Sequence, residues 1–217
     1  MIAHLPELLR QRSCFLFDLD GTLVDSSTCH ERAYLEALTS RLPDLASRFS
    51  YEPCKGRRTR DALRDYGIED EALLTELTRA KQKAYRTLVE SGAVQLLPGA
   101  RELLQALRLD RRLFLVTGST ARSTREVTSQ LGIYDWFEQI VTADDVAEGK
   151  PAPECWLTCM DRAAIRPEKA LVVEDALSGI HSARAAGLKA VVVNNSELVA
   201  LPEYAGTLED ILTALRA

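Results

Sequence analysis

The stretch CFLFDLDGTLVD, residues 14–25, opens with an apolar run and turns abruptly acidic at Asp18 and Asp20. The unbroken apolar run Cys14–Phe17 predicts a β-strand that is buried on both faces, as in a parallel sheet covered by helices on each side. The two aspartates follow this strand directly, so they would stand at its carboxyl end. Because ligands of open parallel sheets bind at that edge, the stretch predicts both a fold class and the place of a functional site.

Further apolar runs of strand length recur along the chain. They lie at residues 113–116, 139–141, 171–173 and 190–193. Helical patterns with boundary signals separate them, such as Pro98-Gly99 before one apolar stripe and Gly187 after another. Short buried strands that alternate with helices are typical of an α/β protein with a parallel sheet.

The segment from residue 26 to 95 breaks this alternation. It contains no comparable strand-like run, but apolar residues recur at helical spacing over residues 34–42 and again over 73–88. So long a helical block is too large for an ordinary crossover between two parallel strands. We therefore predict a helical domain at residues 26–95, inserted into a core formed by residues 1–25 and 96–217.

The other predicted strands also end in polar residues. These are Thr117, Gly118 and Ser119 after the second run, Lys150 in the loop after the third, and Glu174 and Asp175 at the end of the fourth. Loops are polar in general, but this does not account for carboxylates that abut the strands directly. Several carboxylates in one crevice repel each other unless a cation offsets their charge. Oxygen ligands suit Mg²⁺, which also favours phosphate-bearing substrates.

The composition narrows the class of partner. The 217 residues carry a formal net charge of −5, which lacks the basic surplus of a nucleic-acid-binding domain. No stretch approaches the ~20 apolar residues of a membrane span, and the N-terminus lacks the pattern of a cleavable signal. The five cysteines are odd in number and show no zinc-type spacing. We expect a cytoplasmic protein with reduced thiols that binds neither nucleic acid nor membrane.

The motifs together resemble the haloacid dehalogenase superfamily. Residues 18–24, DLDGTLV, are similar to its first motif, Thr117 to the second, Lys150 to the third, and Glu174-Asp175 to the fourth. The resemblance covers most of the chain. It implies a Rossmann-like parallel sheet core with an inserted α-helical cap domain between the first and second motifs, which is where the helical insert was predicted independently.

The resemblance also implies a role for each motif residue. Asp18 would attack phosphorus and form an aspartyl-phosphate, and Asp20 would serve as general acid and base. The transferring phosphoryl group would be held by Thr117, Gly118, Ser119 and Lys150.

The same resemblance implies a Mg²⁺ cofactor. Its ligands would be the Asp18 carboxylate, the backbone carbonyl of Asp20 and Asp175, with Glu174 as a further ligand or as a neighbour of the metal. Family members that remove halide lack an acid–base group two residues after the nucleophile and need no metal. Dehalogenation is therefore not expected here.

A narrower similarity concerns the helical insert. Residues 25–30 resemble the hinge, and residues 55–63 the cap loop, of the β-phosphoglucomutase-like and phosphoglycolate-phosphatase-like branch with a helical C1 cap. From this similarity we expect His30, Lys55 and Arg58 to contact substrate. The match to the mutase pattern of the cap loop is only partial, which favours hydrolysis.

The expected function is a phosphatase acting on a small phosphorylated metabolite, such as a sugar phosphate or a phosphoglycolate-like ester. A sugar phosphomutase of the β-phosphoglucomutase type is the alternative, since the core motifs are shared. A non-catalytic domain on the same fold is a third class, but it would be expected to have lost a motif residue, and none is missing. We expect a monomer or a weak homodimer.

Overall fold

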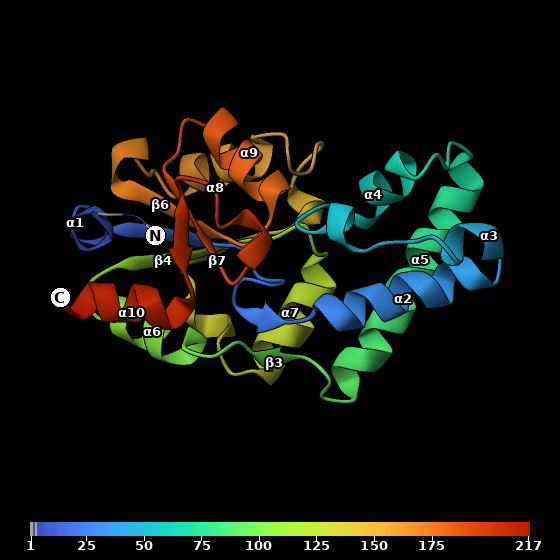
Figure 1. The fold of residues 1–217 in the computed structure, drawn as a ribbon, viewed down its shortest axis with the longest axis horizontal. Helices are drawn as coiled ribbons and strands as arrows, with labels where there is room; N and C mark the ends of the chain where they lie inside the picture. The colour runs from blue at the N-terminus through green and yellow to red at the C-terminus, as the bar shows by residue number, and fades with distance from the viewer. Residues whose placement is uncertain (1, 3) are drawn as a thin grey trace.

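The strand Cys14–Phe17 (β1) lies at the centre of a parallel sheet in the computed structural model, which describes residues 2 and 4–217. In register, Phe15 lies beside Leu113 on one neighbouring strand and beside Leu171 on the other. Within the described residues the sheet has six strands in the order β5-β4-β1-β6-β7-β8. Figure 1 shows this sheet with helices on either side of it. The further strands are β4 (Arg112–Val116), β5 (Gln139–Val141), β6 (Ala170–Glu174), β7 (Ala190–Val193) and β8 (Tyr204–Gly206).

Helices cover both faces of this sheet, and alternate side chains of each strand enter opposite cores. Phe15 and Phe17 pack in one apolar cluster, whereas Leu16 packs in another with Trp156. The predicted burial on both faces is therefore confirmed. The first face is covered by α1 (Leu5–Arg10), α6 (Ala100–Leu107), α7 (Ala121–Gln130) and α10 (Leu208–Arg216), and the second by α8 (Glu154–Arg162) and α9 (Leu177–Ala185).

Short 3₁₀ turns lie in several connections of the core. They are η2 (Tyr134–Trp136), η3 (Ala143–Asp145), η4 (Pro167–Lys169) and η5 (Ser196–Leu198).

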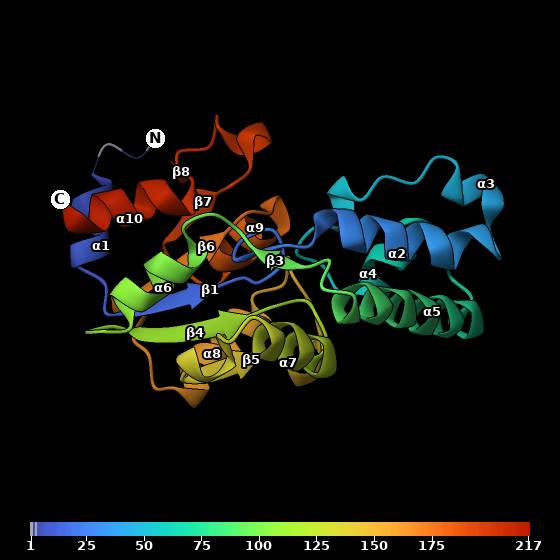
Figure 2. The same cartoon turned by 90° about the horizontal axis from the view of Figure 1, so that it is seen from below.

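The predicted helical insert is confirmed between two short antiparallel strands, β2 (Val24–Asp25) and β3 (Gln95–Leu96). Figure 2 shows the inserted helices beyond one end of the sheet. Their own apolar cluster includes Tyr34 and Leu74. The inserted elements are α2 (Ser27–Thr39), α3 (Pro43–Ala46), η1 (Glu52–Cys54), α4 (Thr59–Asp65) and α5 (Glu71–Glu90). We call residues 26–95 the cap.

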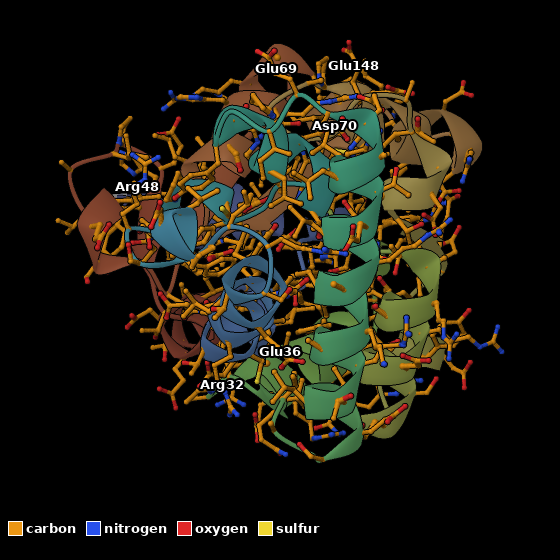
Figure 3. The ribbon with its side chains drawn as sticks, turned by 90° about the vertical axis from the view of Figure 1, so that its right-hand side faces the viewer. Arg32, Glu36, Arg48, Glu69, Asp70 and Glu148 are labelled. Carbon is orange, nitrogen blue, oxygen red and sulfur yellow. The ribbon has the colours of Figure 1, made fainter. Side chains whose placement is uncertain are left out.

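The long helix α5 has a capped start, an exposed charged face and a buried apolar face. Asp70 caps its start by accepting a hydrogen bond from the Leu73 amide at 2.7 Å. The outer surface of the cap carries exposed charged side chains such as Arg32 and Glu69 (Figure 3). The buried face runs through Leu74 and Leu77 and continues into Lys81, Ala84 and Tyr85. Of the predicted apolar stripe Leu73, Leu77, Ala80, Ala84 and Leu88, Leu77 and Ala84 are buried and the other three are half-buried. The buried face also carries a lysine inward.

In the part of the chain that the structure describes, no helix combines the length and the apolar character needed to cross a bilayer.

Candidate active site

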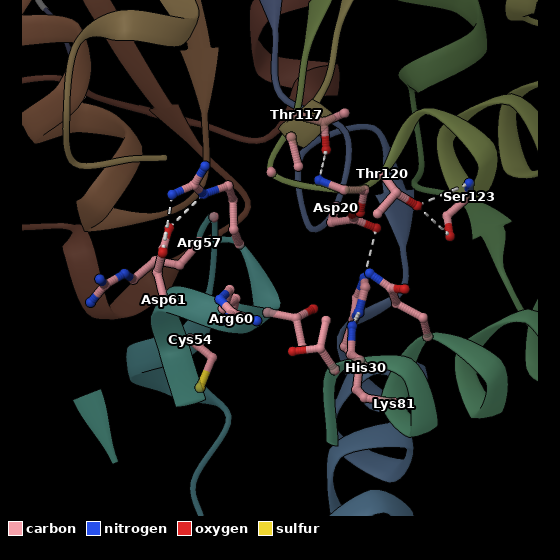
Figure 4. Close-up of a pocket in the computed structure, with 18 of the residues that line it drawn as sticks. Asp20, His30, Cys54, Arg57, Arg60, Asp61, Lys81, Thr117, Thr120 and Ser123 are labelled. Atoms are coloured by element: carbon pink, nitrogen blue, oxygen red, sulfur yellow. Dashed lines mark hydrogen bonds and ion pairs between the residues drawn. The ribbon is translucent and has the colours of Figure 1, made fainter. Parts of the chain in front are cut away.

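A cavity of about 390 Å³ lies between the carboxyl edge of the sheet and the cap. Asp18, Asp20 and Thr117 line it from the core, and His30 and Lys81 line it from the cap. Figure 4 shows the side chains of both parts converging on this space. The first two strand ends predicted from the sequence therefore meet at one site.

A buried ion-pair network joins Asp18, which lines the cavity, to Lys150 and Glu174. We call these residues, together with Asp175, the floor of the site. Lys150 Nζ lies 2.6 Å from Asp18 Oδ1 and 2.6 Å from Glu174 Oε1, and it also donates to the Val116 carbonyl at 3.1 Å. Burial alone would lower the pKa of Lys150, but the two carboxylates outweigh it and raise that pKa. Lys150 is therefore held as a cation between the ends of β1 and β6.

The acidic residues at this floor can hold a metal ion. Asp18, Glu174 and Asp175 each offer a carboxylate oxygen, and these oxygens lie within 4.8 Å of one another. Asp18 Oδ2 is buried and has no hydrogen-bond partner among residues 2 and 4–217. Burial, and then the Glu174 carboxylate, raise the pKa of Asp175 to about 8. A free carboxylate oxygen beside two further acids fits a hard divalent cation.

Neighbouring groups fix the geometry of this acidic cluster. Thr22 Oγ1 donates to Asp175 Oδ1 at 2.9 Å, and Glu174 Oε2 accepts from the amides of Asp175 and Ala176 at 3.0 Å each. Gly21 has a left-handed φ of 86°, and a Cβ there would stand 2.2 Å from Asp175 Oδ2. Gly21 of the first motif therefore permits the left-handed turn and leaves room for the Asp175 carboxylate.

The Asp20 carboxylate is turned toward the cap rather than toward the acidic cluster. Its oxygens accept from Ser26 Oγ and Ser119 Oγ at 2.7 Å each and from Tyr85 OH at 3.3 Å, and His30 Nε2 lies 2.9 Å away. Burial raises the pKa of Asp20, but the His30 ring and the serine hydrogen bonds more than offset it, so the pKa falls below its ordinary value. The side chain of Asp20 therefore faces the cavity.

Behind His30 lies Lys81, which the sequence analysis did not select. Lys81 Nζ lies 2.7 Å from His30 Nδ1 (Figure 4). The His30 ring stacks on Tyr85 with ring centres 4.0 Å apart. Burial lowers the pKa of Lys81 to about 8, and burial and then Lys81 lower the pKa of His30. Because an ammonium has only donors, Nδ1 accepts, so Nε2 carries the ring proton and lies 2.9 Å from Asp20 Oδ1. The chain Lys81–His30–Asp20 thus orients the Asp20 carboxylate from the cap.

We predict that Lys81→Met stabilises the protein while lowering its activity. A buried ammonium is costly, so its removal should raise the free energy of unfolding at pH 7 by about 1–2 kcal/mol in urea denaturation. The turnover number should fall roughly tenfold, because His30 loses the partner that fixes its ring.

The stability that Lys81→Met gains over wild type should decrease as the pH rises. The folded-state pKa of Lys81, about 8, lies below its ordinary value of 10.5. Wild type therefore carries the full penalty below pH 8 and loses it as pH rises from 8 toward the ordinary value, so the advantage of Lys81→Met should shrink over that window. Lys83→Met, at an exposed position of the same helix, is the control. A destabilised Lys81→Met protein at pH 7 would contradict this account.

The Thr117-Gly118-Ser119 turn forms the core wall of the cavity. The Ser119 amide donates to Thr117 Oγ1 at 3.0 Å, and the turn leads into α7, which Thr120 caps through the Ser123 amide. All three residues of the turn line the cavity. The turn therefore offers hydroxyl and amide groups beside Asp18.

The two cap-loop cations lie in different surroundings. Lys55 pairs with Glu52 at 2.5 Å and lines a smaller cavity of about 260 Å³, which Asp175 also lines. Arg58 lines the main cavity, but its guanidinium is bound to Asp61 and to two core carbonyls. Substrate contact by either residue stays a prediction. Arginines that line the main cavity beside Arg58 are Arg57, Arg60 and Arg64.

Comparisons with known proteins agree with this arrangement. Residues 15–193 match the model of the haloacid dehalogenase-like hydrolase family. The chain is 31% identical over 180 residues to the fructose-1-phosphate phosphatase YqaB of Escherichia coli, covering 82% of this chain and 94% of that protein. It is 30% identical to the protein CbbY of Rhodobacter capsulatus, covering 82% and 83%. A hydrolase from Pseudomonas syringae superposes with a TM-score of 0.82 at 25% identity, covering 94% of this chain and 98% of that one.

The chain therefore belongs to the haloacid dehalogenase-like hydrolases, together with CbbY and YqaB, and is a phosphoric monoester hydrolase of that family.

Proposed function

We propose that this protein is a Mg²⁺-dependent phosphatase that hydrolyses a small sugar phosphate through an aspartyl-phosphate on Asp18. The observation that carries the proposal is the state of the Asp18 carboxylate. One of its oxygens is held by Lys150, while the other is buried beside the cavity with no hydrogen-bond partner in the described chain. A carboxylate that is fixed on one side and free on the other is suited to attack an electrophile in the cavity.

Asp20 is the proposed acid and base of the reaction. It follows the nucleophile by two residues, and its carboxylate stands on the cap side of the cavity. Ser26 and Ser119 hold one oxygen each, so the carboxylate has a fixed orientation toward the leaving group of a bound ester. In the free protein Asp20 is a carboxylate, so in this proposal it takes up a proton when the negatively charged phosphate ester binds beside it. It then gives that proton to the leaving oxygen and later takes one from the attacking water.

Charge compensation supports the proposed cofactor. Asp18, Glu174 and Asp175 are all buried, and Lys150 supplies one positive charge among them. A phosphate dianion would add further negative charge. When bound, Mg²⁺ would offset this charge and polarise the phosphoryl oxygens. Asp18, Asp175 and the Asp20 carbonyl are the proposed ligands. Glu174 is the proposed neighbour of the metal, since its oxygens already accept hydrogen bonds from Lys150 and from two backbone amides.

The size and lining of the cavity support a sugar phosphate. Its volume of about 390 Å³ lies at the lower end of the range for small-molecule sites. Beyond the acidic floor it is lined by groups that can bind sugar hydroxyls, among them Thr59, Thr78, Gln82, Thr120 and Ser123. YqaB, which is similar over most of this chain, is named for a sugar-phosphate substrate.

The test of this function is a screen of phosphorylated metabolites with and without Mg²⁺, in which released phosphate is measured. A phosphatase should release one phosphate for each ester consumed. Conversion of a sugar 1-phosphate into its 6-phosphate isomer with little free phosphate would instead identify a phosphomutase. No turnover of any ester would contradict both activities.

Asp20→Asn provides a prediction specific to the acid–base role. With p-nitrophenyl phosphate, whose leaving group needs little protonation, this variant should release about one equivalent of nitrophenol per active site and then stop. The second step should be slowed by roughly a hundredfold or more, because no base activates the water. Stopped-flow absorbance would measure the burst. Steady turnover at the wild-type rate would remove Asp20 from the mechanism.

A further inference from the structure

Arg58 joins the cap to the core at one particular loop. It is the residue that precedes α4, and its Nη1 donates to the carbonyls of Val146 at 3.1 Å and Ala147 at 2.7 Å. Its Nε and Nη2 donate to the two oxygens of Asp61 at 2.6 and 3.1 Å. This paired contact fixes the guanidinium plane, so the remaining donor is aimed at the core.

The loop that Arg58 reaches is the one that leads into Lys150. The amides of Ala147 and Glu148 donate to the Glu154 carboxylate at 2.8 and 2.7 Å. The core therefore holds the amides of this loop, while the cap holds its carbonyls through Arg58.

Gly149 makes the close approach possible. A Cβ at Gly149 would stand 2.8 Å from both Cγ and Nε of Arg58, so the side chain lies directly against the loop backbone. The next residue is Lys150, which pairs with Asp18 and Glu174. Arg58 thus touches the backbone one residue before the buried cation of the site.

Neighbouring residues of the same cap loop meet two other core loops. The Lys55 carbonyl accepts from Ser178 Oγ at 2.8 Å, behind the acidic pair Glu174-Asp175. The Gly56 carbonyl would stand 2.9 Å from a Cβ at Gly118. The cap is therefore seated on the core, and Arg58 provides the charged contact of this loop with the Lys150 loop.

We propose that Arg58 is a positioning residue that latches the seated cap to the core and holds the Lys150 loop in place. Its hydrogen bonds form when the cap meets the core, so they link cap closure to the position of Lys150 against Asp18. This role rests on the proposed function only where activity is the readout. In this role Arg58 acts on the core rather than on the sugar, and the role replaces the substrate contact expected from the cap-loop similarity. Its loss should therefore affect every phosphate ester alike.

The experiment compares Arg58→Ala and Arg58→Lys with wild type by two independent readouts. Spin labels at Glu69→Cys on the cap and Leu109→Cys on the core, both exposed positions, report the cap–core distance distribution by pulsed dipolar spectroscopy. The native cysteines are buried. The second readout is kcat and KM with Mg²⁺, on p-nitrophenyl phosphate and on fructose 1-phosphate. Circular dichroism verifies that each variant is folded.

We expect Arg58→Ala to broaden the distance distribution toward open forms and to lower kcat by roughly 10- to 100-fold on both esters, the range for losing charge-assisted hydrogen bonds. Arg58→Lys keeps the positive charge but lacks the planar guanidinium with its several donors. Its kcat should therefore lie between those of Arg58→Ala and wild type. The control is Arg41→Ala, which breaks an exposed ion pair within the cap to Glu76 and should change neither readout.

Two results would overturn the latch. One is an unchanged distance distribution in folded Arg58→Ala or, should that variant not fold, in Arg58→Lys. The other is a loss confined to fructose 1-phosphate, which would make Arg58 a substrate contact. If wild type turned over neither ester, the proposed function would fail. The distance distributions would still show whether Arg58 holds the cap against the core.

Discussion

Asp18→Asn is expected to lower kcat by at least roughly a thousandfold while the protein remains folded. The amide is nearly isosteric with the carboxylate, but it is a far poorer nucleophile. Lys150 keeps its second partner, Glu174, at 2.6 Å, so the buried cation is not left without a carboxylate. Phosphate release and thermal unfolding, measured on the same preparation, check both parts of this expectation.

The matched control is Asp161→Asn, at an exposed position on α8, which should leave both measurements unchanged. If Asp18→Asn kept even about a tenth of the wild-type turnover, covalent catalysis by Asp18 could not account for the reaction.

Chelation of divalent cations is the second change with a large expected effect. Excess EDTA should reduce turnover to background, and added Mg²⁺ should restore it, because three buried carboxylates and a phosphate dianion cannot share this floor with Lys150 alone. Titration calorimetry should detect Mg²⁺ binding to wild type, and Asp175→Ala should weaken it by roughly tenfold or more. Full turnover in excess chelator would contradict the metal assignment.

The central strands of the sheet could be predicted from the sequence because they are buried on both faces. Residues of Cys14–Phe17 alternate between two apolar clusters, so each position must be apolar and the run is unbroken. The edge strand Tyr204–Gly206 contains Tyr and Gly, is short, and gives no comparable run. The residues at strand ends were found for the same reason, because the topology brings the carboxyl ends of neighbouring parallel strands together.

The cap side of the site was less accessible to sequence reasoning. Lys81 and Tyr85 lie on the buried face of α5, where a pattern of apolar residues alone does not distinguish a lysine that faces inward from one that faces solvent. Their partners, His30 and Asp20, are far away along the chain. The basic cluster around Arg58 was visible, but its contact with Ala147 joins residues 89 positions apart and has no local signal.

In the proposed mechanism Asp18 carries the phosphoryl group during turnover. Acid quenching of Asp20→Asn shortly after mixing with p-nitrophenyl phosphate and Mg²⁺, followed by proteolysis and mass spectrometry, tests it most directly. We expect one added phosphoryl group on the peptide that contains Asp18, with fragment ions assigning it to that residue, and no such adduct in the Asp18→Asn, Asp20→Asn double variant. A burst of nitrophenol without this adduct, or with the phosphoryl group on another residue, would contradict it.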